Sequence, residues 1–201
     1  MTPILAVEKI MNFQLRYKVT EMVKYRTIYC DPPWMETGGG VIKRGADRHY
    51  PLMKTKDIMA LDVPSIADEN CHLYMWVTDA FLEDGIKIMK AWGFKRKRTI
   101  VWGKVNHGVI QTGLGQYFRG STELCLFGTR GHLPYKVNKD GKRCQGRTLI
   151  LEPRTIHSKK PEEMRKMIEV VSYPPYIELF AREKHSGWDV WGNEVESDIL
   201  L

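Results

Sequence analysis

Short apolar runs of the kind that form buried strands alternate along this chain with segments of helical periodicity. The clearest run is 71–77, a nearly continuous series of bulky residues. A helical pattern follows at 81–90, and Gly93 ends it. Strands that alternate with helices pack as a sheet covered on both faces, so the sequence predicts an α/β fold with a three-layer sheet. Further strands are expected at 13–19, 25–30, 98–102, 123–128, 148–151 and 176–181, and further helices at 55–61 and 161–171, with Thr55 and either Thr78 or Asp79 as N-caps.

The run 25–30 is followed by Asp31-Pro32-Pro33-Trp34. Because prolines fix φ and remove backbone donors, this turn predicts a stiff pocket edge. Such an edge suits methylation of a planar exocyclic amine, whose nitrogen lone pair is delocalised and is a poor nucleophile. Hydrogen bonds from the amine to the Asp31 carboxylate and the Pro32 carbonyl draw that lone pair back onto nitrogen, and the Trp34 ring can stack on the base. The alternative is a proline-rich turn with Trp34 in the core.

The length of 201 residues indicates one domain with long functional loops. The chain has no run of about 18 apolar residues, so no membrane span is expected, and its start does not have the pattern of a signal peptide. Within a single domain over 1–201, we expect an N-terminal extension at 1–24, substrate-side loops at 35–50, 104–120 and 129–147, and a tail at 195–201.

The charge and the cysteines bear on partners and compartment. The formal net charge of +7 is compatible with a polyanionic partner such as nucleic acid. None of the four cysteines forms a C-x-x-C pair, so no metal site is expected. Cys30, Cys71 and Cys125 sit in apolar runs, where a reduced buried thiol is the usual state, and this suits a cytoplasmic protein.

With these residues in view, the chain resembles the MT-A70 family of N6-adenine methyltransferases, which use S-adenosylmethionine. The resemblance covers about 25–194 and implies a Rossmann-like methyltransferase sheet in a permuted order, which explains why no G-x-G-x-x-G fingerprint follows the first strand. The matching segments occur in the family's order: Asp31–Trp34, Tyr50–Met53, Leu73–Thr78, Ala91–Phe94, Val101–Lys104, Gly113–Arg119 with Glu123, His157–Pro161, Ile177–Arg182 and Gly187–Glu194.

The resemblance also implies a binding set for S-adenosyl-L-methionine. Glu178 and Arg182 match the segment that holds the cofactor ribose, and a carboxylate is suited to accept hydrogen bonds from its hydroxyls. Lys160 matches the lysine that approaches the cofactor carboxylate, and the helix dipole otherwise disfavours a lysine at that position. The remaining candidates are Asn193 and Glu194, near the adenine and ribose, together with Asp31 and Pro32. The family often has an asparagine shortly after Arg182, and whether His185 or Ser186 takes its place is open.

For the substrate, the resemblance implies that Asp31, Pro32, Pro33 and Trp34 hold and activate an adenine. Other residues expected on the substrate side are Tyr50, Lys104, Arg119, Glu123, Lys136 and Arg143. Arg119 and Glu123 are equally compatible with an ion pair between loop and strand. The basic segments 130–147 and 95–98 are candidates for phosphate contact, or a solvated loop and turn.

The nature of the partner stays open between several readings. DNA is favoured over RNA, because the chain carries no additional RNA-binding module and looks like a prokaryotic or phage modification enzyme. A homodimer or a partner subunit is compatible with the absence of a separate target-recognition domain. A catalytically inactive nucleic-acid-binding subunit is the alternative from another class, although the catalytic and cofactor motifs are all present.

Overall fold

The computed structural model describes residues 23–35, 52–155 and 159–201. The helices are α2 (Thr55–Met59), α3 (Val63–Ile66), α4 (Leu82–Ala91) and α5 (Glu162–Val171), with a 3-10 helix at Asp79–Phe81. The strands are β1 (Tyr25–Cys30), β2 (Ala67–Val77), β3 (Lys95–Asn106), β4 (Val109–Ile110), β5 (Thr122–Arg130), β6 (Leu149–Glu152), β7 (Tyr176–Leu179) and β8 (Trp188–Trp191). The predicted strand at 13–19 lies outside the described residues.

The strands of the described part of the chain form one mixed sheet in the order β4-β3-β5-β2-β1-β7-β8, with β6 paired to β3. β1 is parallel to both β2 and β7, and β7 is parallel to β8. β5 runs antiparallel to β2 and β3, whereas β6 is parallel to β3. The carboxyl ends of β1, β2, β3, β7 and β8 therefore meet at one edge of the sheet, and the start of β5 lies at the same edge.

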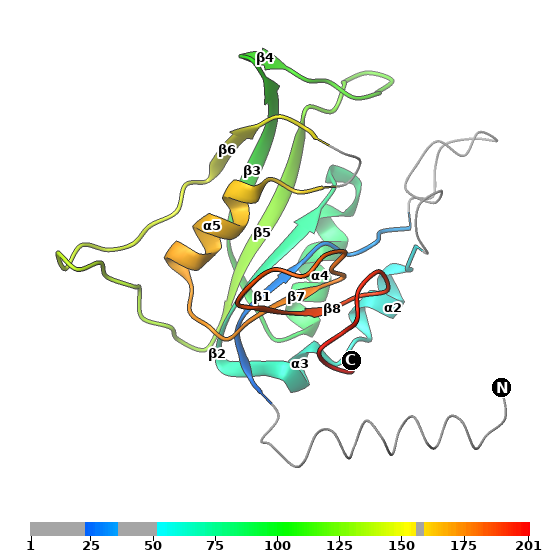
Figure 1. Ribbon diagram of the computed structural model, residues 1–201. Coiled ribbons are helices and arrows are strands. Elements are labelled where there is room, and N and C mark those ends of the chain that lie inside the picture. Colours follow the sequence, from blue (N-terminus) through cyan, green and yellow to red (C-terminus); the bar gives the residue numbers. More distant parts are fainter. Residues whose placement is uncertain (1–22, 36–51, 156–158) are drawn as a thin grey trace, which may run out of the picture.

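Helices cover both faces, as the alternation in the sequence predicts (Figure 1). Side chains of α2, α3 and α4 pack with alternate residues of β1, β2 and β7 in one core cluster. Met164, Met167 and Ile168 of α5 pack on the other face with Tyr29, Trp76 and other residues of the strands. The three-layer α/β prediction is confirmed.

Several local predictions hold and several are wrong. Gly93 follows α4 with φ +84°, the left-handed conformation that favours glycine after a helix. Neither Thr55 nor Thr78 caps a helix through its side chain. Thr55 Oγ1 instead donates to Asp84 Oδ2 over 2.9 Å, which ties α2 to α4. Cys30, Cys71 and Cys125 are buried free thiols, as expected.

Two segments gain structure that the sequence analysis did not assign. The basic run 95–98, interpreted as a solvated turn or a phosphate contact, is the exposed start of β3 and pairs with the end of β5. Residues 195–201, expected to be a tail, run back along β8. Asp198 accepts a hydrogen bond from Val190 N, and Ile199 and Leu201 pack against the core.

Candidate active site

Asp31, Arg182, Glu123 and Lys160, all singled out in the sequence, gather at the carboxyl edge of the sheet. Asp31 follows the last residue of β1, and Arg182 comes three residues after the end of β7. Glu123 lies at the start of β5, which is antiparallel to β2 and so begins at this same edge. Lys160 stands two residues before α5, which covers the face above them.

A chain of alternating charges runs through this edge. Lys160 Nζ lies 2.8 Å from Asp31 Oδ2 and 3.2 Å from Glu123 Oε2. Lys104 Nζ lies 2.7 Å from the other oxygen of Glu123, Oε1. The Lys160 side chain is 16% exposed, so these charges are largely removed from water and depend on one another. Glu123 thus pairs with two lysines, and the alternative ion pair with Arg119 is wrong.

The pKa values of the two carboxyl groups that share Lys160 are shifted in opposite directions from their usual values. Burial raises the pKa of Asp31 above its usual range, and Lys160 only partly offsets this. Burial acts on Glu123 in the same direction, but Lys160 and Lys104 together outweigh it and lower the pKa of Glu123. Burial would lower the pKa of Lys160, yet Asp31 and Glu123 raise it. Lys160 therefore stays charged, and its two partner carboxyl groups have pKa values shifted in opposite directions.

Backbone hydrogen bonds fix the proline turn. Trp34 N donates to Pro32 O over 2.9 Å, and Met53 N donates to Pro33 O over 2.8 Å. The Pro32 carbonyl, expected to accept from a substrate amine, is thus already engaged, although a carbonyl oxygen can accept a second bond. Pro33 contributes to the site by holding the turn against the segment at Met53.

Trp34 does not present an open ring for base stacking. Its side chain is 7% exposed and belongs to the core cluster. The ring stacks on Phe81 with centroids 5.0 Å apart, and Nε1 donates to Trp76 O over 3.1 Å. The structure therefore supports the alternative reading, in which Trp34 anchors the turn from below.

Arg165 is a residue that the sequence analysis missed. Its Nη1 lies 2.6 Å from Glu178 Oε2, and its guanidinium lies over the rings of Tyr29 and Trp188 at 5.7 and 5.2 Å. Glu178 points toward α5 because its neighbours in β7, Ile177 and Leu179, pack on the opposite face. Burial raises the pKa of Glu178, and Arg165 opposes this by favouring the carboxylate.

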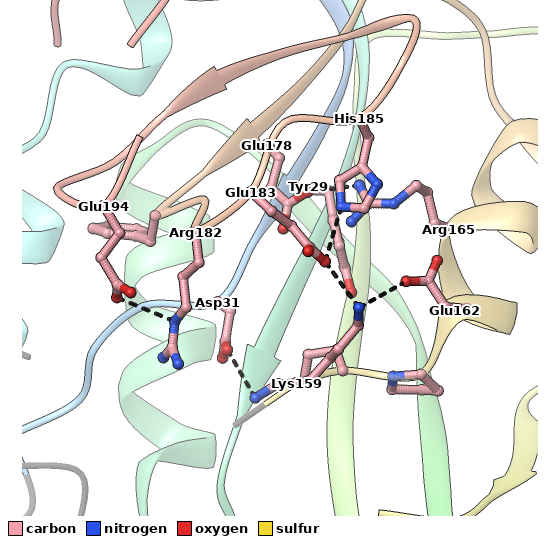
Figure 2. Close-up of a pocket in the computed structure, with 13 residues that line it drawn as sticks. Tyr29, Asp31, Lys159, Glu162, Arg165, Glu178, Arg182, Glu183, His185 and Glu194 are labelled. Atoms are coloured by element: carbon pink, nitrogen blue, oxygen red, sulfur yellow. Dashed lines mark hydrogen bonds and ion pairs between the residues drawn. The ribbon is translucent and has the colours of Figure 1, made fainter. Parts of the chain in front are cut away.

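Two adjoining cavities open at this edge. One of about 310 Å³ is lined by Asp31, Lys160, Arg165, Glu178 and His185, among others. Figure 2 shows Asp31, Arg182 and Glu194 on one side of it and Arg165 and His185 on the other. The second, of about 270 Å³, is lined by side chains that include Pro33, Met53, Leu61 and Asn193. Asp31, Phe180, Arg182 and Glu194 line both cavities.

The turns after β7 and β8 hold these residues through close backbone contact. Phe180 has φ +62°, and Ala181 N donates to Trp191 O over 3.0 Å. A Cβ atom on Gly192 would lie 2.3 Å from Ala181 O, so this position requires glycine. Arg182 Nε and Glu194 Oε1 from the two turns lie 3.6 Å apart. The predicted cofactor residues Arg182, Asn193 and Glu194 are therefore brought together.

The segment after Arg182 closes over the larger cavity. Lys159 Nζ lies 3.0 Å from Glu183 Oε1 and 3.4 Å from Glu162 Oε1, linking this segment to the start of α5. His185 lines the cavity, with its Nε2 3.4 Å from Glu183 Oε1. Of His185 and Ser186, the structure thus brings His185 to the site.

Two expected substrate residues lie on a loop that joins the opposite edge of the sheet. The segment from the end of β5 to the start of β6 begins and ends there, because β5 is antiparallel and β6 parallel to β3. Lys136 Nζ donates to Glu169 O and Ser172 O over 2.6 and 2.8 Å, and so caps the end of α5. Arg143 lies over the ring of Tyr135 in its own loop, at 4.0 Å. The structure therefore does not bring Lys136 and Arg143 to the site.

Arg119 and Tyr50 are also expected on the substrate side, and neither lies on this loop. Arg119 is exposed and donates from Nε to Gly113 O over 2.9 Å, within the loop before β5. Tyr50 lies outside the described residues.

An acid-proline-proline turn at the carboxyl edge of this sheet, with a buried lysine and a buried carboxylate on neighbouring elements, defines a Rossmann-like methyltransferase. The model of the MT-A70 family matches residues 25–194, and the chain belongs to this family.

Three relatives illustrate the similarity. A Mycoplasma protein named type II methyltransferase M.MunI is 34% identical over 88% of this chain and 80% of its own length. An Arabidopsis thaliana N(6)-adenosine-methyltransferase MT-A70-like protein is 31% identical over 95% of this chain and 27% of its own. The human N(6)-adenosine-methyltransferase catalytic subunit METTL3 is 30% identical over 93% of this chain and 31% of its own. The chain thus spans about a third or less of these two eukaryotic proteins.

Among the residues that the structure describes, no helix has the length and apolar character needed to cross a membrane.

Proposed function

We propose that this chain transfers a methyl group from S-adenosyl-L-methionine to N6 of adenine in DNA. The observation that carries the proposal is the position of Asp31. It is a carboxylate directly after β1 that lines both cavities and is held by Lys160. Membership of the MT-A70 family and the similarity to a type II methyltransferase over 80% of that protein's length support the reaction and favour DNA.

The residues at the edge fit the cofactor. Glu178 offers a buried carboxylate for ribose hydroxyls, and Arg165 keeps it ionised. Lys160 offers a cation for the carboxylate of the amino-acid part, and acids line the cavities where a sulfonium would sit. Asn193 and Arg182 border the smaller cavity beside Phe180, a polar and aromatic wall suited to an adenosine. When bound, S-adenosylmethionine supplies an electrophilic methyl group on sulfur.

The chain's own part in the reaction is to make the adenine amine a nucleophile. Asp31 accepts a hydrogen bond from the N6 amine, and the second acceptor position of the Pro32 carbonyl takes the other proton. Both bonds draw the lone pair from the ring onto nitrogen and would make that nitrogen a nucleophile toward the methyl group that bound S-adenosylmethionine would supply. The methylated nitrogen is cationic, and one of its protons leaves through Asp31 to water. Positioning and electrostatics then account for most of the rate.

RNA is a second candidate substrate, because relatives named adenosine methyltransferases share 30–31% identity over more than nine-tenths of the chain. An inactive subunit is disfavoured, since Asp31, Lys160, Glu178, Arg182 and Asn193 are present and gather at one edge.

The test is transfer of tritium from labelled S-adenosylmethionine to matched duplex DNA, single-stranded DNA and RNA, followed by digestion to nucleosides and mass analysis. We expect N6-methyladenine in DNA. Label in RNA alone would overturn the choice of DNA. No label, with cofactor bound as shown by calorimetry, would indicate a missing partner, and loss of cofactor binding as well would restore the inactive-subunit reading.

A further inference from the structure

The segment between β4 and β5, residues 111–121, forms a closed finger at the carboxyl edge. Both ends of the finger are bonded to the backbone of Lys104 in β3: Gln111 N donates to Lys104 O over 2.7 Å, and Lys104 N donates to Ser121 O over 2.9 Å. Farther out, Gly113 N donates to Gly120 O over 2.6 Å. A Cβ atom on Gly115 would collide with the backbone of Phe118, so the turn is as tight as glycine allows. The finger thus has a defined shape and a narrow tip.

The tip carries large apolar side chains in water. Leu114, Tyr117 and Phe118 are 84%, 87% and 92% exposed. Such a group of exposed side chains marks a surface that contacts a partner. The charge around it selects the kind of partner, because residues 104–122 contain no aspartate or glutamate but include Lys104, His107 and Arg119. Aromatic rings beside cations and without acids suit the stacked bases and phosphates of a nucleic acid.

The base of the finger is joined to the catalytic residues. β3 ends and β5 begins at the edge where Asp31 lies, and the finger projects beyond the sheet there (Figure 1). Lys104, which holds both sides of the finger through its backbone, pairs through its side chain with Glu123. Glu123 shares Lys160 with Asp31, so the finger is fixed relative to the reacting group.

We propose that Tyr117 and Phe118 stack on the bases that flank the target adenine and fill the gap that it leaves in a duplex. This inference rests on the proposed function. An adenine must leave the helix to reach Asp31, which costs the stacking and pairing of that base. The two rings at the tip replace part of the lost stacking. Arg119, which is held to Gly113 O at the foot of the turn, contacts the phosphate backbone of the nucleic acid beside those bases.

The experiment compares the double variant Tyr117→Ala/Phe118→Ala with Tyr117→Phe/Phe118→Tyr, which retains both rings. Leu200→Ala, which removes an apolar side chain that is 73% exposed and far from the finger in sequence, serves as the matched control. The probes are a duplex with the adenine that the wild-type protein methylates, the same duplex with a mismatch opposite that adenine, and the single strand. Methylation kinetics are measured on each, and 2-aminopurine fluorescence at the target position reports extrusion of the base.

We expect the alanine pair to lower kcat/KM on the matched duplex by about 10–100-fold, the loss of one or two stacking contacts. The defect should shrink on the mismatched duplex, where extrusion costs less, and the rise in 2-aminopurine fluorescence should be lost. The ring-retaining pair and Leu200→Ala should behave like wild type.

Equal losses on all three probes, or no loss, would overturn the proposal. So would a change in oligomeric state by sedimentation that accompanies the loss, because the tip would then bind a protein partner. In each of these cases the wild-type protein still methylates adenine and the proposed function stands. Absence of methylation of DNA by the wild-type protein would overturn both.

Discussion

The two edges of this sheet both carry buried polar groups, but of different kinds. At the edge where the parallel strands begin, Ser172 Oγ lies 2.8 Å from His72 Nδ1 and 2.7 Å from Tyr74 OH, and Lys136 caps α5. These hydrogen bonds close the end of α5 and involve no carboxylate. At the carboxyl edge, Asp31 and Glu123 share a buried lysine. We therefore expect groups at the first edge to act on stability and groups at the second to act on chemistry.

Among substitutions that test the difference between the two edges, Asp31→Ala is expected to have the largest effect. Removing the carboxylate takes away the acceptor that localises the amine lone pair and receives its proton, so turnover should fall by about 10²–10³-fold or more. Affinity for S-adenosylmethionine, measured by calorimetry, should stay within a few-fold. Asp140→Ala, an exposed acid on the loop 131–148, should leave turnover unchanged. Turnover near wild type in the Asp31 variant would remove the chemical distinction between the edges.

The next effect concerns stability at the opposite edge. Burial lowers the pKa of His72 from 6.5 to about 4, with Arg26 adding to the effect. The unfolded chain thus takes up a proton that the folded chain excludes. The contribution to the free energy of unfolding is present in full above pH 6.5 and is lost as the pH falls toward 4. Between about pH 7.5 and about pH 5 this loss should amount to about 2 kcal/mol.

Urea unfolding of the wild-type protein and of His72→Gln at both pH values measures this component, because other titrating groups are common to the two. The wild type should lose about 2 kcal/mol more than the variant. Equal losses would show that His72 accepts a proton in the folded state.

A smaller effect is expected from Arg165→Met at the carboxyl edge. Glu178 would stay buried without its counter-charge, so its pKa, already raised by burial, would rise further. Affinity for S-adenosylmethionine should fall by about 10-fold, as for the loss of one charged hydrogen bond, and should recover as the pH is raised. Calorimetric titration across pH provides the measurement.

Lys166→Met, an exposed position on the same helix, is the matched control, and Arg165→Lys should restore part of the affinity. A fall in affinity that does not vary with pH would mean that Arg165 supports only the packing of α5.

The smallest effect is expected from Lys136→Met. Loss of its bonds to the last carbonyls of α5 should lower the free energy of unfolding by about 1 kcal/mol. Methyl transfer and the salt dependence of DNA binding should not change, which kinetic assays over a range of ionic strength can check. A flatter salt dependence of DNA binding in the variant would show that Lys136 and its loop, 131–148, contact the substrate.

The sequence predicts the core of the fold well where its strands are short apolar runs. The strands β1, β2, β5 and β7 are predicted because each is a short apolar run, and the parallel pairing of β1 and β7 brings Asp31 and Glu178 to one edge. β8 was missed, since its four residues Trp188–Trp191 show only a weak alternation. The start of β3 was missed because its charged residues form a strand only through pairing with β5.

Side-chain roles were harder to predict than elements. Lys136 has the charge of a phosphate ligand, but its location depends on the directions of β5 and β6, which composition does not reveal. In the sequence, Arg165 is a residue of a predicted helix and has no predicted role in the site. Its spacing from Pro161 and Ile168 places it beside the buried stripe of α5, and this was the available signal. The sequence predicts that the Trp34 ring stacks on a base, whereas the ring stacks on Phe81 within the protein.

The backbone contact between Gly192 and Ala181 limits how this protein can be engineered. The wall of the smaller cavity formed by Met53 and Leu61 consists of side chains, which can be shortened to admit a bulkier cofactor analogue. Gly192, which also lines this cavity, has no side chain to shorten, and any side chain at 192 would collide with Ala181 O and push the two turns apart. Enlargement has to begin at the side-chain wall. Loss of activity after substitution at 192 would report a displaced turn and not a lost ligand contact.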